Sequence, residues 1–256
     1  MSTFALARRL RAGETVYSGW CALGSPIVAE SVARAGFSAV VLDAQHGLWD
    51  TASVLAGIAG LHHAGAAPIV RVPLNDFGFV SRALDFGAEA IIAPMINSAA
   101  DARIFAAVAK YPSLGERSWG PTRAMSLQGL SDVTDYLRDA NTGTLTLAMI
   151  ETPQALANVD AIAATPGIDA LFIGPYDLST SLSGGKAQDI DAPEVNKAID
   201  TICAAAVKAG KIPGIYCRDA ERALMMSKRG FKFLTVGSDQ GLVRDGALAQ
   251  LIALKG

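Results

Sequence analysis

The sequence has few cysteines, few charged residues and no long uninterrupted apolar run. Its cysteines, Cys21, Cys203 and Cys217, are too widely spaced for a disulfide framework or a Cys-x-x-Cys metal site. This usage fits a reducing compartment, so we expect a cytoplasmic protein. No apolar stretch approaches the roughly 20 residues needed to span a bilayer, because Gly, Pro or a charge interrupts each one. Residues 1–13 lack the features of a signal peptide and predict an amphipathic helix.

The charge balance is close to neutral. Charged residues make up 18% of the 256 positions, the formal net charge is -2, and there is no Lys/Arg block. Without a basic patch, neither nucleic acid nor a membrane is expected as a partner. The hydrophobic content of 51% indicates one globular domain, spanning residues 1–256, with a large core.

Several catalytic motifs are also absent. No G-x-G-x-x-G follows the first strand-like run, which disfavours the alternative of a Rossmann-like fold. The sequence contains no G-x-S-x-G, no Walker lysine motif and no strand-end lysine suited to a Schiff base. The chemistry must therefore come from other polar side chains.

The sequence does contain a repeated alternation of strand-like runs and segments with helical periodicity. Alternating βα units predict a parallel sheet covered by helices, and about eight units in this length favour a closed (β/α)₈ TIM barrel. The strand-like runs are 16–20, 39–42, 68–72, 90–95, 145–150, 170–173, 212–217 and 231–236. Helices are expected at 26–35, 50–63, 77–86, 99–109, 132–140, 153–164, 193–209, 220–228 and 242–254, with long loops at 111–130 and 183–192.

Two carboxylates stand where consecutive predicted strands end. Glu151 follows the run 145–150, and Asp177 follows the next run closely. Chemistry in such barrels collects at the carboxyl ends of the strands, and a few carboxylate oxygens suit Mg²⁺ or Mn²⁺. Each acid could instead cap the helix that follows it. Gly174-Pro175 is either a plain turn or a helix start that presents N–H groups to an anion.

Three further polar residues lie at the ends of earlier strands. Arg71 sits inside an apolar run and needs an anionic partner. It is expected to pair with Asp43 or Asp85, or to face a developing oxyanion, and the two roles are compatible. His46 is the only histidine at a strand end and is a candidate base. The other two histidines lie in a predicted helix.

These residues together resemble the HpcH/HpaI family of class II pyruvate aldolases, which includes 4-hydroxy-2-oxoheptanedioate aldolase. The similarity runs in order over nearly the whole chain. It is carried by Trp20, the segments 43–46 (DAQH), 68–71 (PIVR), 84–87 (LDFG), 94–95 (PM), 115–120 (GERSWG), 149–151 (MIE) and 172–179 (FIGPYDLS), and the pairs 213–214 and 236–237. The resemblance implies a barrel of the phosphoenolpyruvate/pyruvate type that makes or breaks a carbon–carbon bond between pyruvate and an aldehyde.

The resemblance also implies residue roles. Glu151 and Asp177 would bind Mg²⁺, Mn²⁺ or Co²⁺, and the stretch from Gly174 to Asp177 would receive the pyruvate carboxylate. Arg71 would stabilise the enolate, and His46 would act as the base. Asp85 would raise the basicity of that histidine, and Asp43 completes the predicted catalytic set. The remaining expected substrate contacts are Trp20, Met149, Pro175, Tyr176 and Tyr216. Members of the family assemble as hexamers, which predicts a homo-oligomer.

This chain departs from the family pattern at three positions. Gln45 replaces a glutamate, Met149 replaces a polar glutamine, and Tyr176 replaces a small residue. Because Leu48, Trp49, Trp119 and Tyr216 are expected in or beside strand-end loops, we predict a narrow, weakly polar pocket mouth. Such a mouth favours short hydroxylated or apolar aldehydes over acidic semialdehydes. A loop cation such as Arg123 would restore acid recognition.

Two other functions remain open at this stage. A CoA-thioester lyase of the malyl or citramalyl type uses a related barrel, but it needs a basic groove for the CoA phosphates, and no Lys/Arg cluster is evident. A barrel that binds a keto acid without converting it is the other alternative. Metal and pyruvate binding without any aldehyde turnover would favour it.

Overall fold

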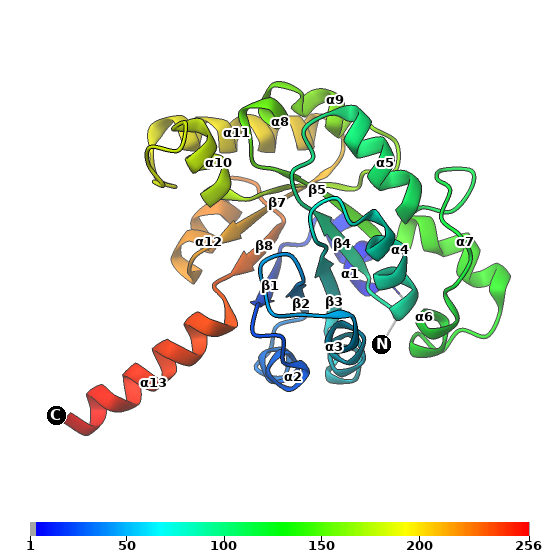
Figure 1. Ribbon diagram of the computed structural model, residues 1–256, viewed down its shortest axis with the longest axis horizontal. Helices are drawn as coiled ribbons and strands as arrows, with labels where there is room; N and C mark the ends of the chain where they lie inside the picture. The colour runs from blue at the N-terminus through cyan, green and yellow to red at the C-terminus, as the bar shows by residue number, and fades with distance from the viewer. Residues whose placement is uncertain (1–3, 256) are drawn as a thin grey trace.

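In the computed structural model, which describes residues 4–255, eight parallel strands close into a barrel (Figure 1). Each strand pairs with its sequence neighbours, and β8 pairs with β1. The predicted TIM barrel is thus confirmed, and the open Rossmann-like alternative is wrong. The strands are β1 (Val16–Cys21), β2 (Ala39–Asp43), β3 (Ala67–Arg71), β4 (Ala90–Ala93), β5 (Leu145–Ile150), β6 (Ala170–Ile173), β7 (Ile212–Cys217) and β8 (Phe233–Val236).

The strands are largely apolar because both of their faces are covered. Every residue of β2, β3 and β5 is buried. One face packs inside the barrel, where Ile69, Ile92, Leu147 and Phe172 belong to one core cluster. The other face packs against the helices in a second, larger cluster. This two-sided burial produces the near-continuous apolar runs of the sequence.

Helices surround the barrel, and most of them begin at a side chain that accepts a first-turn N–H, as Ser25, Asp50, Asp76 and Ser98 do. The helices are α1 (Ala5–Arg11), α2 (Pro26–Arg34), α3 (Thr51–Ala64), α4 (Phe77–Phe86), α5 (Ala99–Ala109), α6 (Thr122–Leu127), α7 (Val133–Gly143), α8 (Pro153–Ala157), α9 (Val159–Ala163), α10 (Pro175–Leu182), α11 (Pro193–Lys208), α12 (Ala220–Lys228) and α13 (Asp239–Lys255).

Two helical predictions need correction. The single helix expected at 153–164 is interrupted at Asn158, which leaves α8 and α9 as two short helices. The loop expected at 111–130 contains the short helix α6, whose Ala124 and Met125 are buried. The other expected helices are present, with ends displaced by a few residues.

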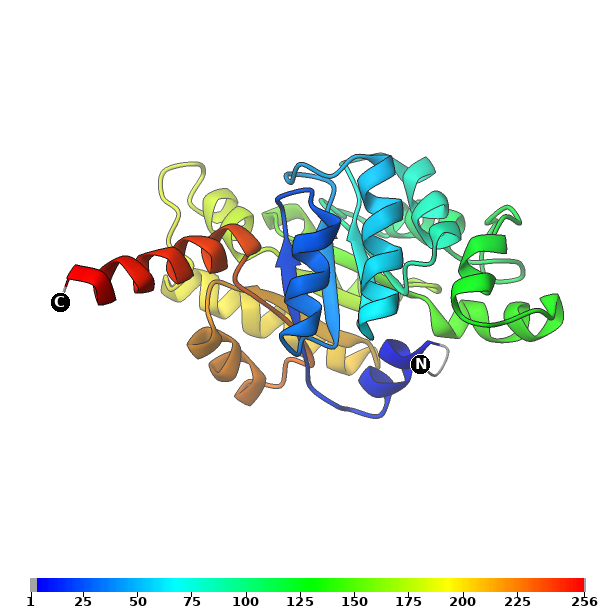
Figure 2. The same cartoon turned by 90° about the horizontal axis from the view of Figure 1, so that it is seen from below.

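The first helix closes the amino-terminal end of the barrel (Figure 2). Leu6, Ala7 and Leu10 of α1 are buried and belong to the interior core cluster. The backbone N–H of Leu6 donates to Oε2 of the buried Glu89 (3.1 Å). The opposite, carboxyl-terminal end of the barrel is therefore the end that can admit a ligand.

The last helix, α13, leaves the barrel and extends away from it (Figures 1 and 2). Asp239 is its only buried residue within the described range. Its exposed apolar side chains include Leu248, Leu251 and Ile252. None of the helices between residues 4 and 255 combines the length and apolar character that a membrane crossing requires.

Candidate active site

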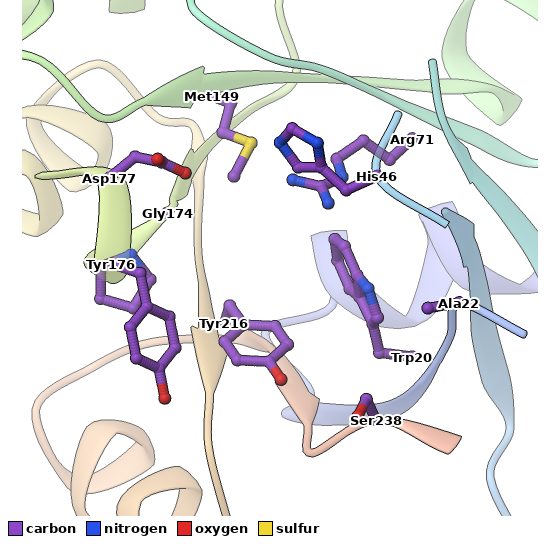
Figure 3. A pocket seen from close by; sticks show the side chains of 11 residues that line it. Trp20, Ala22, His46, Arg71, Met149, Gly174, Tyr176, Asp177, Tyr216 and Ser238 are labelled. Atoms are coloured by element: carbon purple, nitrogen blue, oxygen red, sulfur yellow. The ribbon is translucent and has the colours of Figure 1, made fainter. Parts of the chain in front are cut away.

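A pocket of about 230 Å³ opens at the carboxyl ends of the strands (Figure 3). All of the predicted substrate-contacting residues meet here, together with two residues that the sequence did not single out, Ala22 and Ser238. The lining comprises Trp20, Ala22, His46, Arg71, Met149, Gly174, Pro175, Tyr176, Asp177, Tyr216 and Ser238. Residues from seven of the strands and their following loops thus converge on one site.

Arg71 lines the pocket and forms an ion pair with Asp43, which lies outside the pocket lining. Its Nε donates to Oδ1 of Asp43 (2.8 Å), and its Nη2 donates to Oδ2 (2.6 Å). The guanidinium carbon stands 4.7 Å from the ring centroid of Trp20, a cation–π contact. Asp43 is therefore the anionic partner of Arg71, and Asp85 is not. Because the arginine also lines the pocket, its charge is available to a ligand.

Asp43 also organises the loop that carries His46. Its Oδ1 accepts the backbone N–H groups of Gln45 (3.1 Å) and His46 (3.3 Å). The His46 side chain is exposed and lies beside Arg71 on the pocket rim (Figure 3). Asp43 is only 2% exposed and does not line the pocket. We therefore interpret Asp43, predicted as catalytic, as a residue that positions Arg71 and His46.

Asp85 has a different partner from the one expected. It lies on α4, and its Oδ1 accepts a hydrogen bond from Nη2 of Arg117 (2.5 Å). The side chain of Arg117 is fully buried and stacks on Tyr111, with its guanidinium carbon 4.5 Å from the ring centroid. Sequence reasoning did not identify Arg117, because it sits in a polar loop that gives no sign of burial. The coupling of Asp85 to His46 stays a prediction.

Glu151 is a buried acid with one uncommitted oxygen. It is 2% exposed; its Oε1 accepts the backbone N–H of Met95 (2.8 Å), and its Oε2 has no hydrogen-bond partner. Burial raises the pKa of Glu151 to about 7, and the negative charge of Asp177 acts in the same direction. The hydrogen bond from Met95 and the charge of Arg71 oppose this rise. A buried acid with a perturbed pKa beside a pocket is a candidate functional residue.

The alternative that the two acids are helix caps is not supported. Thr152 caps α8 by accepting the N–H of Ala155 (3.0 Å), so Glu151 is not needed there. Asp177 lies inside the first turn of α10, whose N-cap position is Gly174. Its side chain is exposed and lines the pocket. Both carboxylates are thus free for another role.

Gly174 is required by the close approach of the chain to Glu151. A Cβ atom at this position would lie 2.4 Å from Glu151 Oε2 and 2.5 Å from Met149 Cε. The first intrahelical bond of α10 runs from Leu178 N to Gly174 O (3.0 Å). The preceding N–H groups of Tyr176 and Asp177 therefore have no intrahelical partner, and the helix start can bind an anion such as a carboxylate.

The donor set fits a divalent cation that keeps open coordination positions. Within the described residues no group of three or more His, Cys, Asp or Glu side chains gathers to enclose a metal ion. The two available carboxylates, Glu151 and Asp177, would leave positions for water and for substrate oxygens, the usual arrangement for Mg²⁺. The unpaired Oε2 of Glu151 supports this assignment.

Aromatic rings form one wall of the pocket. Trp20 meets Tyr216 edge-on, with ring centroids 5.3 Å apart, and Tyr216 lies 6.0 Å from Tyr176. Figure 3 shows the two tyrosines facing the side of the pocket opposite His46. Met149 completes the apolar surface between Asp177 and Arg71.

Three residues expected at the pocket mouth lie elsewhere. Trp49 is buried in the outer core, where its Nε1 donates to the carbonyl oxygen of Cys21 (2.8 Å). Trp119 packs against Tyr111, with ring centroids 5.6 Å apart. Leu48 is exposed, but it does not line the pocket. The prediction that these three residues narrow the mouth is therefore wrong.

Arg123 also lies outside the pocket lining. It is an exposed residue of α6. Tyr216 and Tyr176 thus lie on the predicted acceptor side, and among residues 4–255 Arg71 is the only arginine that lines the pocket.

The chain is similar to known proteins in both sequence and fold. The family model for HpcH/HpaI aldolase/citrate lyase matches residues 17–246. A hydroxypyruvate/pyruvate aldolase of Rhizorhabdus wittichii is 38% identical over 94% of each chain. The crystal structure of an HpcH/HpaI aldolase/citrate lyase family protein from Burkholderia cenocepacia J2315 has a TM-score of 0.90, with 32% identity over 99% of this chain and 100% of the other.

A more distant protein shares the barrel fold. The citrate lyase β subunit of Mycobacterium tuberculosis, solved with oxaloacetate and magnesium, has a TM-score of 0.60 and 18% identity, covering 91% of this chain and 95% of the other. At this identity the likeness concerns the fold alone.

Proposed function

Because the chain belongs to the HpcH/HpaI aldolase/citrate lyase family, we propose that it is a class II pyruvate aldolase. It would catalyse the reversible addition of pyruvate, or a close 2-oxo acid, to an aldehyde to give a 4-hydroxy-2-oxo acid. The observation that carries the proposal is the unpaired Oε2 of buried Glu151 beside the pocket that contains Asp177 and Arg71. This combination suits a dication and a keto acid.

The keto acid would bind through its carboxylate at the start of α10. The N–H groups of Tyr176 and Asp177 and the helix dipole favour an anion there. A dication held by Glu151 and Asp177 would supply Lewis-acid polarisation of the neighbouring keto carbonyl. Gly174 permits this arrangement, because a larger residue would collide with Glu151.

Arg71 and His46 would divide the remaining chemistry. Arg71 places a fixed positive charge where the enolate oxygen develops, an effect worth roughly 3 kcal/mol when one such donor is lost. Its orientation is held by Asp43 and Trp20. In the cleavage direction His46 would take the proton from the 4-hydroxyl group while the aldehyde departs. Its exposed position on the rim suits exchange of that proton with solvent.

The aromatic wall supports a preference for small or weakly polar acceptors. Tyr176 and Tyr216 offer ring surface and a hydroxyl group each, but no positive charge. A distant carboxylate on the acceptor would lose hydration there without gaining a cationic partner. Glycolaldehyde and glyceraldehyde are therefore proposed as better acceptors than succinic semialdehyde.

The CoA-thioester lyase alternative is less well supported. A groove beside the pocket is lined by two arginines, and both are already paired with carboxylates. Arg218 bonds Asp191 (2.8 Å) and Asp219 (3.1 Å), and Arg244 bonds Asp245 (2.9 Å). These cations have less attraction left for the phosphates of CoA.

The exposed α13 supports the further proposal of a homo-oligomer. Isolated helices of about this length are marginally stable in water and depend on packing of their apolar face. On α13 that face includes Leu248, Leu251 and Ile252, and all three side chains are exposed in the single chain. A second copy of the chain would cover them. The hexamer and the cytoplasmic location remain predictions from the resemblance and the composition.

The decisive experiment follows exchange of the pyruvate methyl protons in D₂O by NMR, with and without an aldehyde. Exchange should require Mn²⁺ or Mg²⁺, cease with a chelator and return on adding metal. Glu151→Gln and Asp177→Asn should each lose exchange and Mn²⁺ binding together. Unchanged Mn²⁺ affinity in both variants would show that the metal site is misassigned. Pyruvate binding without exchange or aldehyde turnover would favour the non-catalytic barrel.

A further inference from the structure

The segment 94–98, which links β4 to α5, is hydrogen-bonded to the end of β5 and to Asn158, between α8 and α9. Ile96 donates its backbone N–H to the carbonyl oxygen of Met149 (3.2 Å). Asn158 donates its side-chain amide to the carbonyl oxygen of Asn97 (2.9 Å). The segment is thus held against the strand end that carries the buried carboxylate.

Met95, within this segment, has a backbone conformation that is rare for its residue type. Its φ is 56°, in the left-handed region that few residues other than glycine enter. The N–H groups of Met95 and Ile96 both donate to the end of β5, the first to Glu151 Oε1 (2.8 Å) and the second to the Met149 carbonyl. Strained residues of this kind persist where the surrounding contacts over-determine them, and they cluster at functional sites.

The hydrogen bond from Met95 makes the two carboxylate oxygens of Glu151 different from each other. Oε1 is occupied by the Met95 N–H, whereas Oε2 is buried and has no partner. Oε2 faces the space left by the missing side chain of Gly174. A carboxylate free to rotate could exchange its two oxygens; one that is hydrogen-bonded on one side presents the same oxygen each time.

We propose that Met95 is a positioning residue for cation binding, acting through its left-handed backbone rather than its side chain. The inference rests on the proposed function, because it assumes that Glu151 holds the metal. Its backbone N–H fixes Glu151 so that Oε2 is aimed at the site shared with Asp177. The Met95 side chain is partly exposed and does not line the pocket, so it has no direct part in binding.

Three substitutions at this position separate the backbone from the side chain. Leu matches Met in size and branching at Cβ, and Gly enters the left-handed region without strain. Val is β-branched, so the same conformation is strongly disfavoured. Partners that orient a metal ligand typically change affinity by about 10- to 100-fold when removed.

The experiment is a calorimetric titration of metal-free, full-length protein with Mn²⁺. Wild type, Met95→Leu and Met95→Gly should bind within about threefold of one another, and Met95→Val should bind about 10- to 100-fold more weakly. Asn75→Val is the matched control, because exposed Asn75 has φ 61° in another strand-end loop but donates no backbone hydrogen bond to a site residue in the described chain. Its Mn²⁺ affinity should stay at the wild-type value.

Each other outcome has a distinct meaning. Wild-type affinity in a folded Met95→Val would overturn the inference, and so would an equal loss in Met95→Gly, because that loss would assign the effect to the side chain. Equal loss in Asn75→Val would attribute the effect to general strain and would also overturn it. Failure of the wild-type protein to bind Mn²⁺ would instead contradict the proposed function.

Discussion

The positively charged side chain of Arg71 can be buried because it forms an ion pair with Asp43 and a cation–π contact with Trp20. The same carboxylate holds the N–H of His46, so one buried acid orients both residues proposed to act on the substrate. A bidentate pair fixes the plane of the guanidinium as well as its place. Precise placement of this charge is what stabilisation of a developing oxyanion requires.

Replacing Asp43 should first of all lower the free energy of unfolding. Asp43→Ala leaves Arg71 as an uncompensated buried charge, and breaking such a pair costs about 3–5 kcal/mol of unfolding free energy. The measurement is urea unfolding of wild type, Asp43→Ala, Arg71→Leu and the double variant Asp43→Ala/Arg71→Leu. The second change removes the orphaned charge and should recover part of the loss. If the double variant were as unstable as the sum of both single variants, the pair would not be coupled.

His46 should affect proton transfer without affecting metal binding. His46→Ala removes the proposed base, a change that usually slows the reaction by about 10² to 10⁴. The Mn²⁺ affinity of the variant should equal that of wild type. The reason is that His46 lies beside Arg71 and is not one of the proposed metal ligands, Glu151 and Asp177. Aldol cleavage and calorimetric titration should be compared in the same preparation. Turnover equal to wild type across the pH range would exclude the base role.

Acceptor choice should follow the aromatic wall. With saturating pyruvate, kcat/KM should be higher for glycolaldehyde or glyceraldehyde than for succinic semialdehyde, because Tyr176 and Tyr216 provide no cation for a second carboxylate. Arg123→Ala serves as the control and should leave this ratio unchanged if Arg123 plays no part. A tenfold advantage for the semialdehyde would contradict the prediction. Loss of that advantage in Arg123→Ala would identify the missing cation.

At the scale of secondary structure, the barrel could be predicted because its strands are buried on both faces. β3 and β5 therefore appear as mostly apolar runs, and parallel packing brings the polar residues at their carboxyl ends to one edge. The burial of particular side chains in the loops could not be predicted from the apolar pattern. Trp49 turns into the outer core, and Arg117 is buried beneath Tyr111, because of contacts with residues far away in the sequence.

The junction between α1 and β4 should make stability depend on pH. Burial raises the pKa of Glu89 above its ordinary 4.5, although the hydrogen bond from Leu6 and the charge of Arg8 oppose this. The folded state then binds the proton more tightly than the unfolded state, so this residue's contribution to stability falls as pH rises from 4.5 through the raised pKa. Glu89→Gln removes that dependence.

The check is chemical unfolding of wild type and Glu89→Gln at several pH values. The variant should gain stability relative to wild type as pH rises from about 4 to 8, because Gln carries no charge to bury. Taking the difference between the two proteins cancels the contribution of other acids such as Glu151. A difference that stayed constant, or that fell with rising pH, would contradict the assignment.

For the molecule as a whole, the barrel and its last helix present different kinds of surface. Most of the helices from α2 to α12 turn their apolar faces to the strands, and α6 and α7 pack in a smaller cluster with Phe4 and Tyr111. In contrast, α13 keeps contact mainly at its first residue. There the carboxylate of Asp239 accepts the N–H groups of Ala22 (2.8 Å) and Leu23 (3.0 Å). This anchoring fixes the point where α13 leaves the barrel, next to Ser238 of the pocket.

An apolar helix held away from its own barrel should be covered by another copy of the chain. Wild-type protein should therefore sediment as a homo-oligomer, and Leu251→Asp/Ile252→Asp should shift it to smaller species, because charges would replace the apolar contact. Gln250→Asp adds a charge on the same helix at a polar position and is the matched control. Circular dichroism should show the barrel intact in both variants, since these residues are exposed in the single chain. A wild-type monomer, or an unchanged oligomer in the double variant, would show that α13 does not mediate assembly.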